Sequence, residues 1–393
     1  MKRLEFQRNL LDHAQKQALA KGFYDFPIVD ADCHYFQTPL LEIAELVEEP
    51  WRQRLIAGTK GANITTIPAD LGDRTLGGRT RVKEHFHSAK KPGDERLPQT
   101  VYPLLESSQK MGIDYNVVFP TDLLVFGLHP QSMFEVALAK GYNRWMTERV
   151  LPYDDSLVAM LYLPFSDPEA CIEIVKEHGN KKGVIGFLVT SVRRQPVHDN
   201  RYMPLYKLIE ETGKPLSFHT VSYWLDQPFN QFNNFLSAHA LGFPLYNMIH
   251  LTNIVINGIP ERFPDMKFLF IEAGVTWLPF IMSRLDSDYM LRSSEAPSLT
   301  KKPSEYIKNF YFTSQPLEYI EDSKKMETTF DWFDAENQLL YSSDYPHQDF
   351  DTPSSIYDLP FLSEKAKRKI LGENALKLFG IDNPVLHARR ILK

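Results

Sequence analysis

The 393-residue sequence has few cysteines, no long apolar run and no excess of positive charge. Two cysteines, Cys33 and Cys171, are too few for a disulfide framework or a Cys-rich zinc site. No stretch of about 18 apolar residues appears, and the first 22 residues lack the apolar core of a signal peptide, so we expect a cytoplasmic protein without a membrane partner. The net charge of -6 gives no long-range attraction for nucleic acid. A small-molecule substrate is therefore the favoured partner.

Hydrophobic residues make up 43% of the chain, which is enough for a large core. Eight short apolar runs recur with helical material between them, as is typical of strands buried on both faces of a parallel sheet. Eight such strands predict a (β/α)8 TIM barrel. We expect an N-terminal helix over residues 1–22 and a single barrel domain over 23–393. The runs are FPIVDADC, DYNVVFPT, LVAMLYLP, GVIGFLVT, PLSFHT, MKFLFIEAG, NFYFTS and QLLYSSDYP.

Two segments interrupt the regular spacing of these runs. Residues 50–108, inserted after the first strand, are predicted to form a cap over the barrel mouth, and their charged composition favours a solvated loop over a ligand pair at His85 and His87. Residues 220–250 are rich in aromatic residues and asparagine. They are expected to line the pocket or a subunit interface, and an ordinary packed loop is the alternative.

Polar residues stand where several of the apolar runs end. Asp30, Asp32 and His34 alternate along the first run, so their side chains point to one side of the strand. Because catalytic groups of a (β/α)8 barrel gather at the carboxyl ends of the strands, residues from different runs would meet there. Imidazole and carboxylate together form a site suited to zinc, iron or manganese. The candidates are Asp32, His34, His219, Glu272, Asp344 and His347.

Each candidate also has a purely structural interpretation. Taken singly, Asp32 or Asp344 could cap a helix, and His219 could be a hydrogen-bonded core residue. Burying several polar residues at the strand ends would cost free energy unless they bind a common partner, and this favours a metal ion. Glu272 and His347 could bind the ion, hold its ligands or move protons.

Five stretches are informative in their order and spacing: VDADCH, KPLSFHT, INGIPERFPDMKFLFIEAGVTWLPFIMSRLD, LLYSSDYPH and ENALKLFG. In these stretches the chain resembles the amidohydrolase-related family that includes aminocarboxymuconate semialdehyde decarboxylase, within the amidohydrolase superfamily. The resemblance implies a barrel with one or sometimes two divalent ions, held by Asp32, His34, His219 and Asp344. It further implies an oligomer, most simply a homodimer, in which Arg284 reaches the neighbouring site. A hetero-oligomer with a paralogue is the alternative partner prediction.

Two residue types differ from the family pattern. Members often carry His-x-His on the first strand where this chain has Asp32-Cys33-His34, and the decarboxylase has a histidine where this chain has Glu272. Additional carboxylates favour manganese or iron over zinc and could support a second ion.

The predicted function is a metal-dependent hydrolase or decarboxylase acting on a small carboxylate- or amide-bearing substrate. Its metal would bind water or a substrate oxygen, and Asp344 or Glu272 would move a proton. Arg284 is the expected clamp for a substrate carboxylate, and Arg79 and Arg81 are weaker candidates. The alternatives are a dinuclear iron or iron/manganese oxygenase and an inactive subunit supporting a paralogue.

Overall fold

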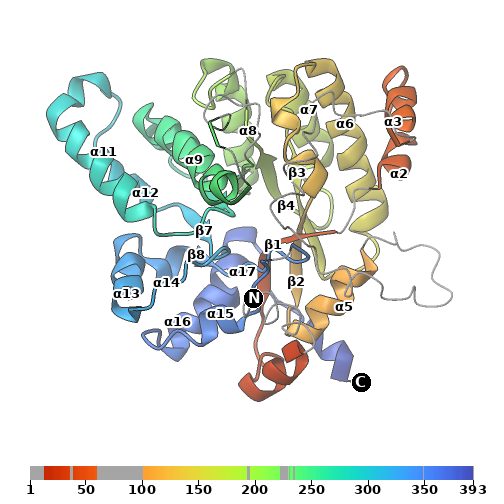
Figure 1. The fold of residues 1–393 in the computed structure, drawn as a ribbon. Helices are drawn as coiled ribbons and strands as arrows, with labels where there is room; N and C mark the ends of the chain where they lie inside the picture. Colours follow the sequence, from red (N-terminus) through yellow and green to blue (C-terminus); the bar gives the residue numbers. More distant parts are fainter. Residues whose placement is uncertain are drawn as a thin grey trace.

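The computed structural model describes residues 13–35, 39–59, 101–192, 195–221, 229, 231–232, 235–347 and 349–392. Eight parallel strands within these ranges form one sheet in which each strand pairs with the next along the chain (Figure 1). The (β/α)8 barrel is thereby confirmed, and each predicted run supplies one strand. The strands are β1 (Val29–His34), β2 (Tyr115–Phe119), β3 (Leu157–Tyr162), β4 (Val184–Val189), β5 (Leu216–His219), β6 (Phe268–Ile271), β7 (Tyr311–Thr313) and β8 (Leu339–Leu340).

The barrel closes because the chain that follows β8 runs beside β1. The Ala31 amide donates to the Tyr341 carbonyl at 2.9 Å, and the Asp344 amide donates to the Asp32 carbonyl at 2.8 Å. These backbone bonds place Asp32 and Asp344, two predicted ligands from opposite ends of the sequence, in adjacent segments. The seam between the first and last strands therefore forms part of the predicted site.

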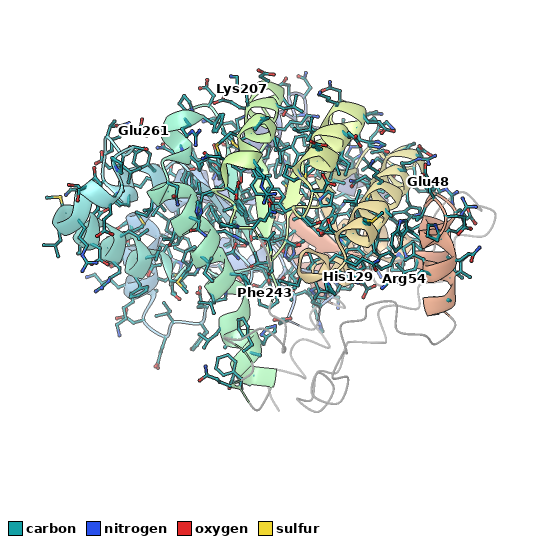
Figure 2. All side chains as sticks on the ribbon, turned by 90° about the horizontal axis from the view of Figure 1, so that it is seen from above. Glu48, Arg54, His129, Lys207, Phe243 and Glu261 are labelled. Carbon is teal, nitrogen blue, oxygen red and sulfur yellow. The ribbon has the colours of Figure 1, made fainter. Side chains whose placement is uncertain are left out.

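Helices surround the strands and cover their outer faces (Figures 1 and 2). Figure 2 shows Lys207 and Glu261 at the outer edge of this helical layer. Among the described residues, no helix combines the length and apolar character needed to cross a membrane. The helices are α2 (Leu40–Ala44), α3 (Trp51–Thr59), α5 (Tyr102–Met111), α6 (Ser132–Trp145), α7 (Pro168–His178), α8 (Met203–Thr212), α9 (Phe235–Ile256), α10 (Ile259–Arg262), α11 (Leu278–Arg292), α12 (Pro303–Ile307), α13 (Ser323–Trp332), α14 (Ala335–Gln338), α15 (Ser354–Tyr357), α16 (Glu364–Arg368) and α17 (Asn374–Phe379).

Local sequence signals set the ends of these helices. The Asp167 side chain caps α7 by accepting from the Glu169 and Ala170 amides, and Pro168 occupies the first turn, where its missing N–H costs nothing. Helix α8 ends at Gly213, which adopts a left-handed conformation that side chains disfavour. The helical material expected between the apolar runs is thus present at α7 and α8.

Parts of three predicted segments lie outside the described residues. Of the N-terminal helix, residues 13–21 are described and helical. The inserted cap is described only at its two ends, so the arrangement of Arg79, Arg81, His85 and His87 stays a prediction. In the aromatic segment, Phe229 is buried and stacks on Tyr246 of α9 with 6.0 Å between ring centroids, so this residue packs within its own chain.

Candidate metal site

The predicted ligands come from four strands whose carboxyl ends share the barrel mouth. Asp32 and His34 lie in β1, and His219 is the last residue of β5. Glu272 directly follows β6, and Asp344 lies in the segment after β8. Both of these acidic residues have positive φ angles, 53° for Glu272 and 56° for Asp344. A left-handed backbone at residues other than glycine is strained and is often found at functional sites.

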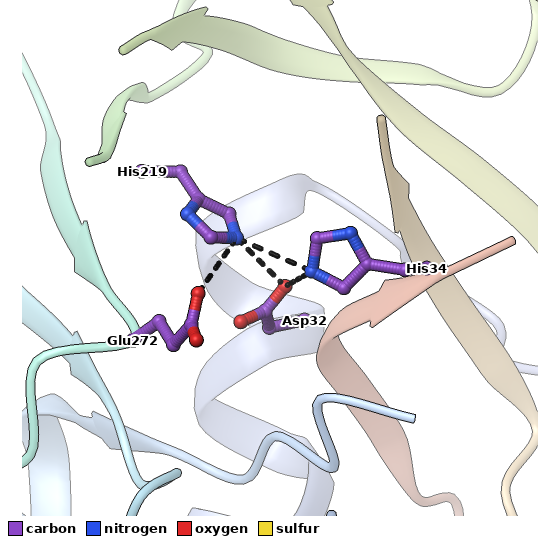
Figure 3. Close-up of side chains that lie close together, drawn as sticks. All are labelled: Asp32, His34, His219 and Glu272. Carbon is purple, nitrogen blue, oxygen red and sulfur yellow. Dashed lines mark hydrogen bonds and ion pairs between the residues drawn. The ribbon is translucent and has the colours of Figure 1, made fainter. Parts of the chain in front are cut away.

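Three of these side chains meet at almost equal distances (Figure 3). The Asp32 Oδ1 atom lies 3.3 Å from His34 Nε2 and 3.4 Å from His219 Nε2. The two Nε2 atoms are 3.4 Å apart. Glu272 extends this triangle, because its Oε2 atom lies 3.6 Å from His219 Nε2. Two imidazoles and two carboxylates therefore turn their donor atoms toward one point.

A second group of donors shares His34 with the first. The Asp344 Oδ1 atom lies 3.3 Å from His34 Nε2 and 2.5 Å from His347 Nδ1. His347 in turn places Nε2 3.3 Å from Thr121 Oγ1. The six metal-site residues predicted from the sequence are thus brought together in two overlapping groups that could each hold an ion.

The donor set fits a divalent cation in both spacing and chemistry. Ligand atoms about 2.0–2.2 Å from one ion, arranged tetrahedrally or octahedrally, lie about 3.0–3.6 Å apart, and the distances around Asp32 fall in this range. Both carboxylate oxygens of Asp32 are buried without a hydrogen-bond partner among the described residues. Such a buried charge is costly unless a cation balances it. Nitrogen and oxygen donors together suit zinc, manganese or iron.

The pKa values of these residues also indicate that the cluster favours a bound cation. Burial alone would raise the pKa of Asp32, but the positive charge that His219 and His34 can carry beside it lowers this pKa below its usual value. Burial would likewise raise the pKa of Asp344, but His347 and His34 lower it below its usual value. For His34, burial disfavours the charged ring, yet Asp32 and Asp344 raise its pKa to about 9. The carboxylates therefore attract positive charge to this point, and a metal ion can supply that charge in place of a proton.

Asp30 alternates with the ligands of β1 but does not belong to the donor groups. Its Oδ1 atom accepts from the Ser343 amide at 2.8 Å and from the Asp32 amide at 3.2 Å. Its Oδ2 atom accepts from the Ser343 hydroxyl at 2.5 Å. Burial raises the pKa of Asp30 to about 8, although the hydrogen bonds from Ser343 oppose this rise. Asp30 thus connects β1 to the segment that carries Asp344.

Arg284 is the predicted site residue that does not join this cluster. It lies on α11 with its side chain 64% exposed, and its Nε atom pairs with Asp288 Oδ2 at 3.1 Å. A role in substrate binding would require a second subunit to bring Arg284 to the mouth of another barrel, and it stays a prediction.

Several residues that hold the site were not identified from the sequence. Thr121 contacts His347, and Ser343 contacts Asp30. The Thr313 hydroxyl accepts from the Glu272 amide at 3.0 Å. The one available signal was position, because each of these hydroxyl residues stands at or just beyond the end of an apolar run.

A (β/α)8 barrel with buried histidines and carboxylates at its mouth defines the class of barrel enzymes that can hold a catalytic metal ion. The sequence profile of the family described as Amidohydrolase matches residues 29–381. The chain belongs to this family, as the resemblance of its motifs predicted.

Similar proteins named for an activity include decarboxylases. The chain is 22% identical over 270 residues to a gamma-resorcylate decarboxylase from Rhizobium sp., covering 64% of this chain and 79% of that protein. It is 22% identical over 269 residues to a 2-amino-3-carboxymuconate-6-semialdehyde decarboxylase from Dictyostelium discoideum, covering 67% and 72%. The crystal structure of a dihydroxybenzoic acid decarboxylase from Polaromonas sp., with bound manganese and 2-nitroresorcinol as inhibitor, has a TM-score of 0.63 at 17% identity, covering 91% of this chain and 98% of that chain. This last similarity shows the shared fold.

Proposed function

We propose that this protein is a metal-dependent decarboxylase that removes CO2 from a small aromatic carboxylic acid. One observation carries the proposal: Asp32, His34 and His219 form a buried donor triangle with edges of 3.3–3.4 Å at the mouth of an amidohydrolase barrel. The gamma-resorcylate and aminocarboxymuconate semialdehyde decarboxylases among its relatives support the reaction type. A divalent ion held there would act as a Lewis acid toward substrate oxygens.

The residues proposed to hold the ion are Asp32, His34, His219 and Asp344. Glu272 is proposed as a fifth donor or as an acid/base group, because its Oε2 atom lies 3.6 Å from His219 Nε2. Manganese is the favoured ion, since carboxylates form a large part of the donor set and a manganese-containing decarboxylase shares the fold.

Decarboxylation requires a proton as well as an ion. The bond between the carboxyl carbon and the ring carbon breaks, CO2 leaves, and the electron pair left on the ring carbon takes up one proton. We propose that His347 donates this proton, because its side chain is 8% exposed whereas those of His34 and His219 are fully buried. Asp344, which lies 2.5 Å from His347 Nδ1, would orient the ring and stabilise its charged form.

Hydrolysis of an amide or ester remains the second candidate function. The same donor set could serve it, and a hydrolase would need no cationic clamp for a substrate carboxylate. The oxygenase and inactive-subunit hypotheses gain no support from the named relatives. A homodimer in which Arg284 supplies the clamp is part of the decarboxylase proposal.

The test is a metal count followed by turnover of dihydroxybenzoic acids carrying a 13C-labelled carboxyl group, with the manganese-loaded protein in D2O. We expect labelled CO2 and a product with one deuterium at the carbon that lost the carboxyl group. His219→Ala should lose both the metal and this activity while staying folded. Amide or ester hydrolysis without CO2 release would reject the decarboxylase in favour of the hydrolase, and oxygen consumption with two irons would favour the oxygenase.

Glu272→Gln separates the two roles proposed for Glu272. Loss of bound metal would identify Glu272 as a ligand, whereas unchanged metal with lost turnover would identify it as a proton-transfer group. Unchanged metal and unchanged turnover would show that Glu272 has neither role.

A further inference from the structure

Glu318 lies in the loop between β7 and α13 and contacts the turn that follows β6. Its carboxylate accepts from the Val275 amide at 3.1 Å and from the Thr276 amide at 3.0 Å. The Thr276 hydroxyl adds a bond of 2.6 Å to Glu318 Oε1. One half-buried side chain thus holds consecutive backbone N–H groups of a neighbouring loop. Successive amides in a turn of this kind form a concave site for an anion.

The geometry of Gly274 shows how closely Glu318 approaches this turn. A Cβ atom at Gly274 would lie 2.4 Å from Glu318 Oε1, and the φ angle of +66° also disfavours a side chain there. Only glycine satisfies both conditions without displacing Glu318. On the other side of the turn, Trp277 Nε1 donates to the Gly274 carbonyl at 3.0 Å.

The same turn carries Glu272, whose backbone is also left-handed. A residue other than glycine does not keep this conformation unless its surroundings hold it. The contacts that hold it come from β7 and the loop after β7, because Thr313 accepts from the Glu272 amide and Glu318 accepts from the amides that follow. The Glu272 carboxylate is then directed at His219.

We infer that Glu318 is a positioning residue, which holds the Glu272–Trp277 turn in the conformation that delivers the Glu272 carboxylate to the metal site. Glu318 itself contacts the backbone of the turn and acts on the site through Glu272. This inference rests on the proposed function to the extent that Glu272 contributes to metal binding.

The test is a double-mutant cycle of manganese affinity, measured by competition with a chelator in Glu318→Gln, Glu272→Gln and the double variant. We expect Glu318→Gln to weaken manganese binding by about 10-fold, as for other residues that orient ligands. The double variant should bind manganese no more weakly than Glu272→Gln alone. Glu321→Gln, an exposed change on the same loop, is the control and should have no effect.

Two results would overturn the inference: unchanged affinity in Glu318→Gln, or independent losses in the double variant. Affinities that follow the expected pattern in a protein that releases no CO2 would reject the proposed function and keep the role of Glu318. A wild-type protein that binds no divalent ion would reject both.

A pair of glycine variants provides a second measurement. Gly274 and Gly213 share a φ angle of +66°, but a Cβ at Gly213 would meet nothing within 4 Å. Gly213→Ala therefore measures the cost of the backbone alone, whereas Gly274→Ala also displaces Glu318. We expect manganese affinity to fall in Gly274→Ala and to stay unchanged in Gly213→Ala. Equal affinities in the two variants would count against the role of Glu318.

Discussion

The turns that carry Glu272 and Asp344 share a left-handed backbone but are held in different ways. The Asp344 turn is held from inside the barrel by Asp30, a fully buried carboxylate that bonds to Ser343. The Glu272 turn is held from the periphery by the half-buried Glu318. The Asp344 turn is therefore held by a residue of the barrel core, and the Glu272 turn by a side chain of a neighbouring loop.

The largest difference between the turns should appear when their acidic residues are neutralised. Asp344 contacts both His34 and His347, whereas Glu272 contacts His219. We expect Asp344→Asn to lower kcat/KM by about 100- to 10,000-fold, because it would remove charge from the site and the partner that orients His347. Glu272→Gln should cost less. Equal losses of kcat/KM and of bound metal in both variants would contradict the prediction that Asp344 contributes more to the site than Glu272.

Asp30→Asn tests whether the Asp344 turn depends on the core. Asp30 now accepts backbone N–H groups at Oδ1 and the Ser343 hydroxyl at Oδ2. The NH2 group of an asparagine would replace one of these two acceptors, so a buried donor would lose its partner. We expect the free energy of unfolding to fall by about 1–3 kcal/mol and manganese affinity to fall by about 10- to 100-fold. Urea denaturation and chelator competition measure the two effects. Glu318→Gln should change affinity with little change in unfolding, and a similar loss of stability in both variants would contradict the comparison.

Glu135 belongs to neither turn and should make the free energy of unfolding depend on pH. It is buried in α6, where its Oε1 atom accepts from the Tyr162 hydroxyl at 2.8 Å. Burial raises its pKa from 4.5 to about 7, although hydrogen bonds from Ser166 and Tyr162 oppose the rise. Between these values the folded protein keeps a proton that the unfolded chain has lost. The contribution of Glu135 to stability is therefore present at low pH and falls as pH rises through this window, by at most about 1.4 kcal/mol per pH unit.

Denaturation of wild type and Glu135→Gln across pH 4.5 to 7 measures this contribution. The variant should show a shallower fall in stability with rising pH, and its manganese affinity at pH 7 should equal that of wild type. A loss of affinity in Glu135→Gln would mean that the metal site is sensitive to packing outside both turns.

The strands and the ligands were predictable because both follow local patterns in the sequence. Strands buried on two faces give short apolar runs, and the polar residues that end these runs meet because parallel strands share one mouth. The supporting residues follow no such pattern. Ser343 and Asp30 are 313 positions apart, and Glu318 lies 42 positions from the Thr276 amide that it holds. Left-handed backbone at Glu272 and Asp344 likewise depends on these distant contacts, so it could not be inferred from either residue type.

The closure of the barrel also has a consequence for the order of events during synthesis. The segment after β8 joins β1 through the bond from the Asp344 amide to the Asp32 carbonyl. The site around Asp32 is therefore incomplete until the segment that carries Asp344 has been synthesised. A growing chain that has reached β7 already contains Asp32, His34, His219 and Glu272 but lacks the segment that completes the seam. Pairing across so long a sequence separation is slow, because closing the loop costs entropy before the contact forms. The complete donor set can therefore assemble only after most of the polypeptide has left the ribosome. Binding of the metal by all of its proposed ligands would then require a fully folded barrel.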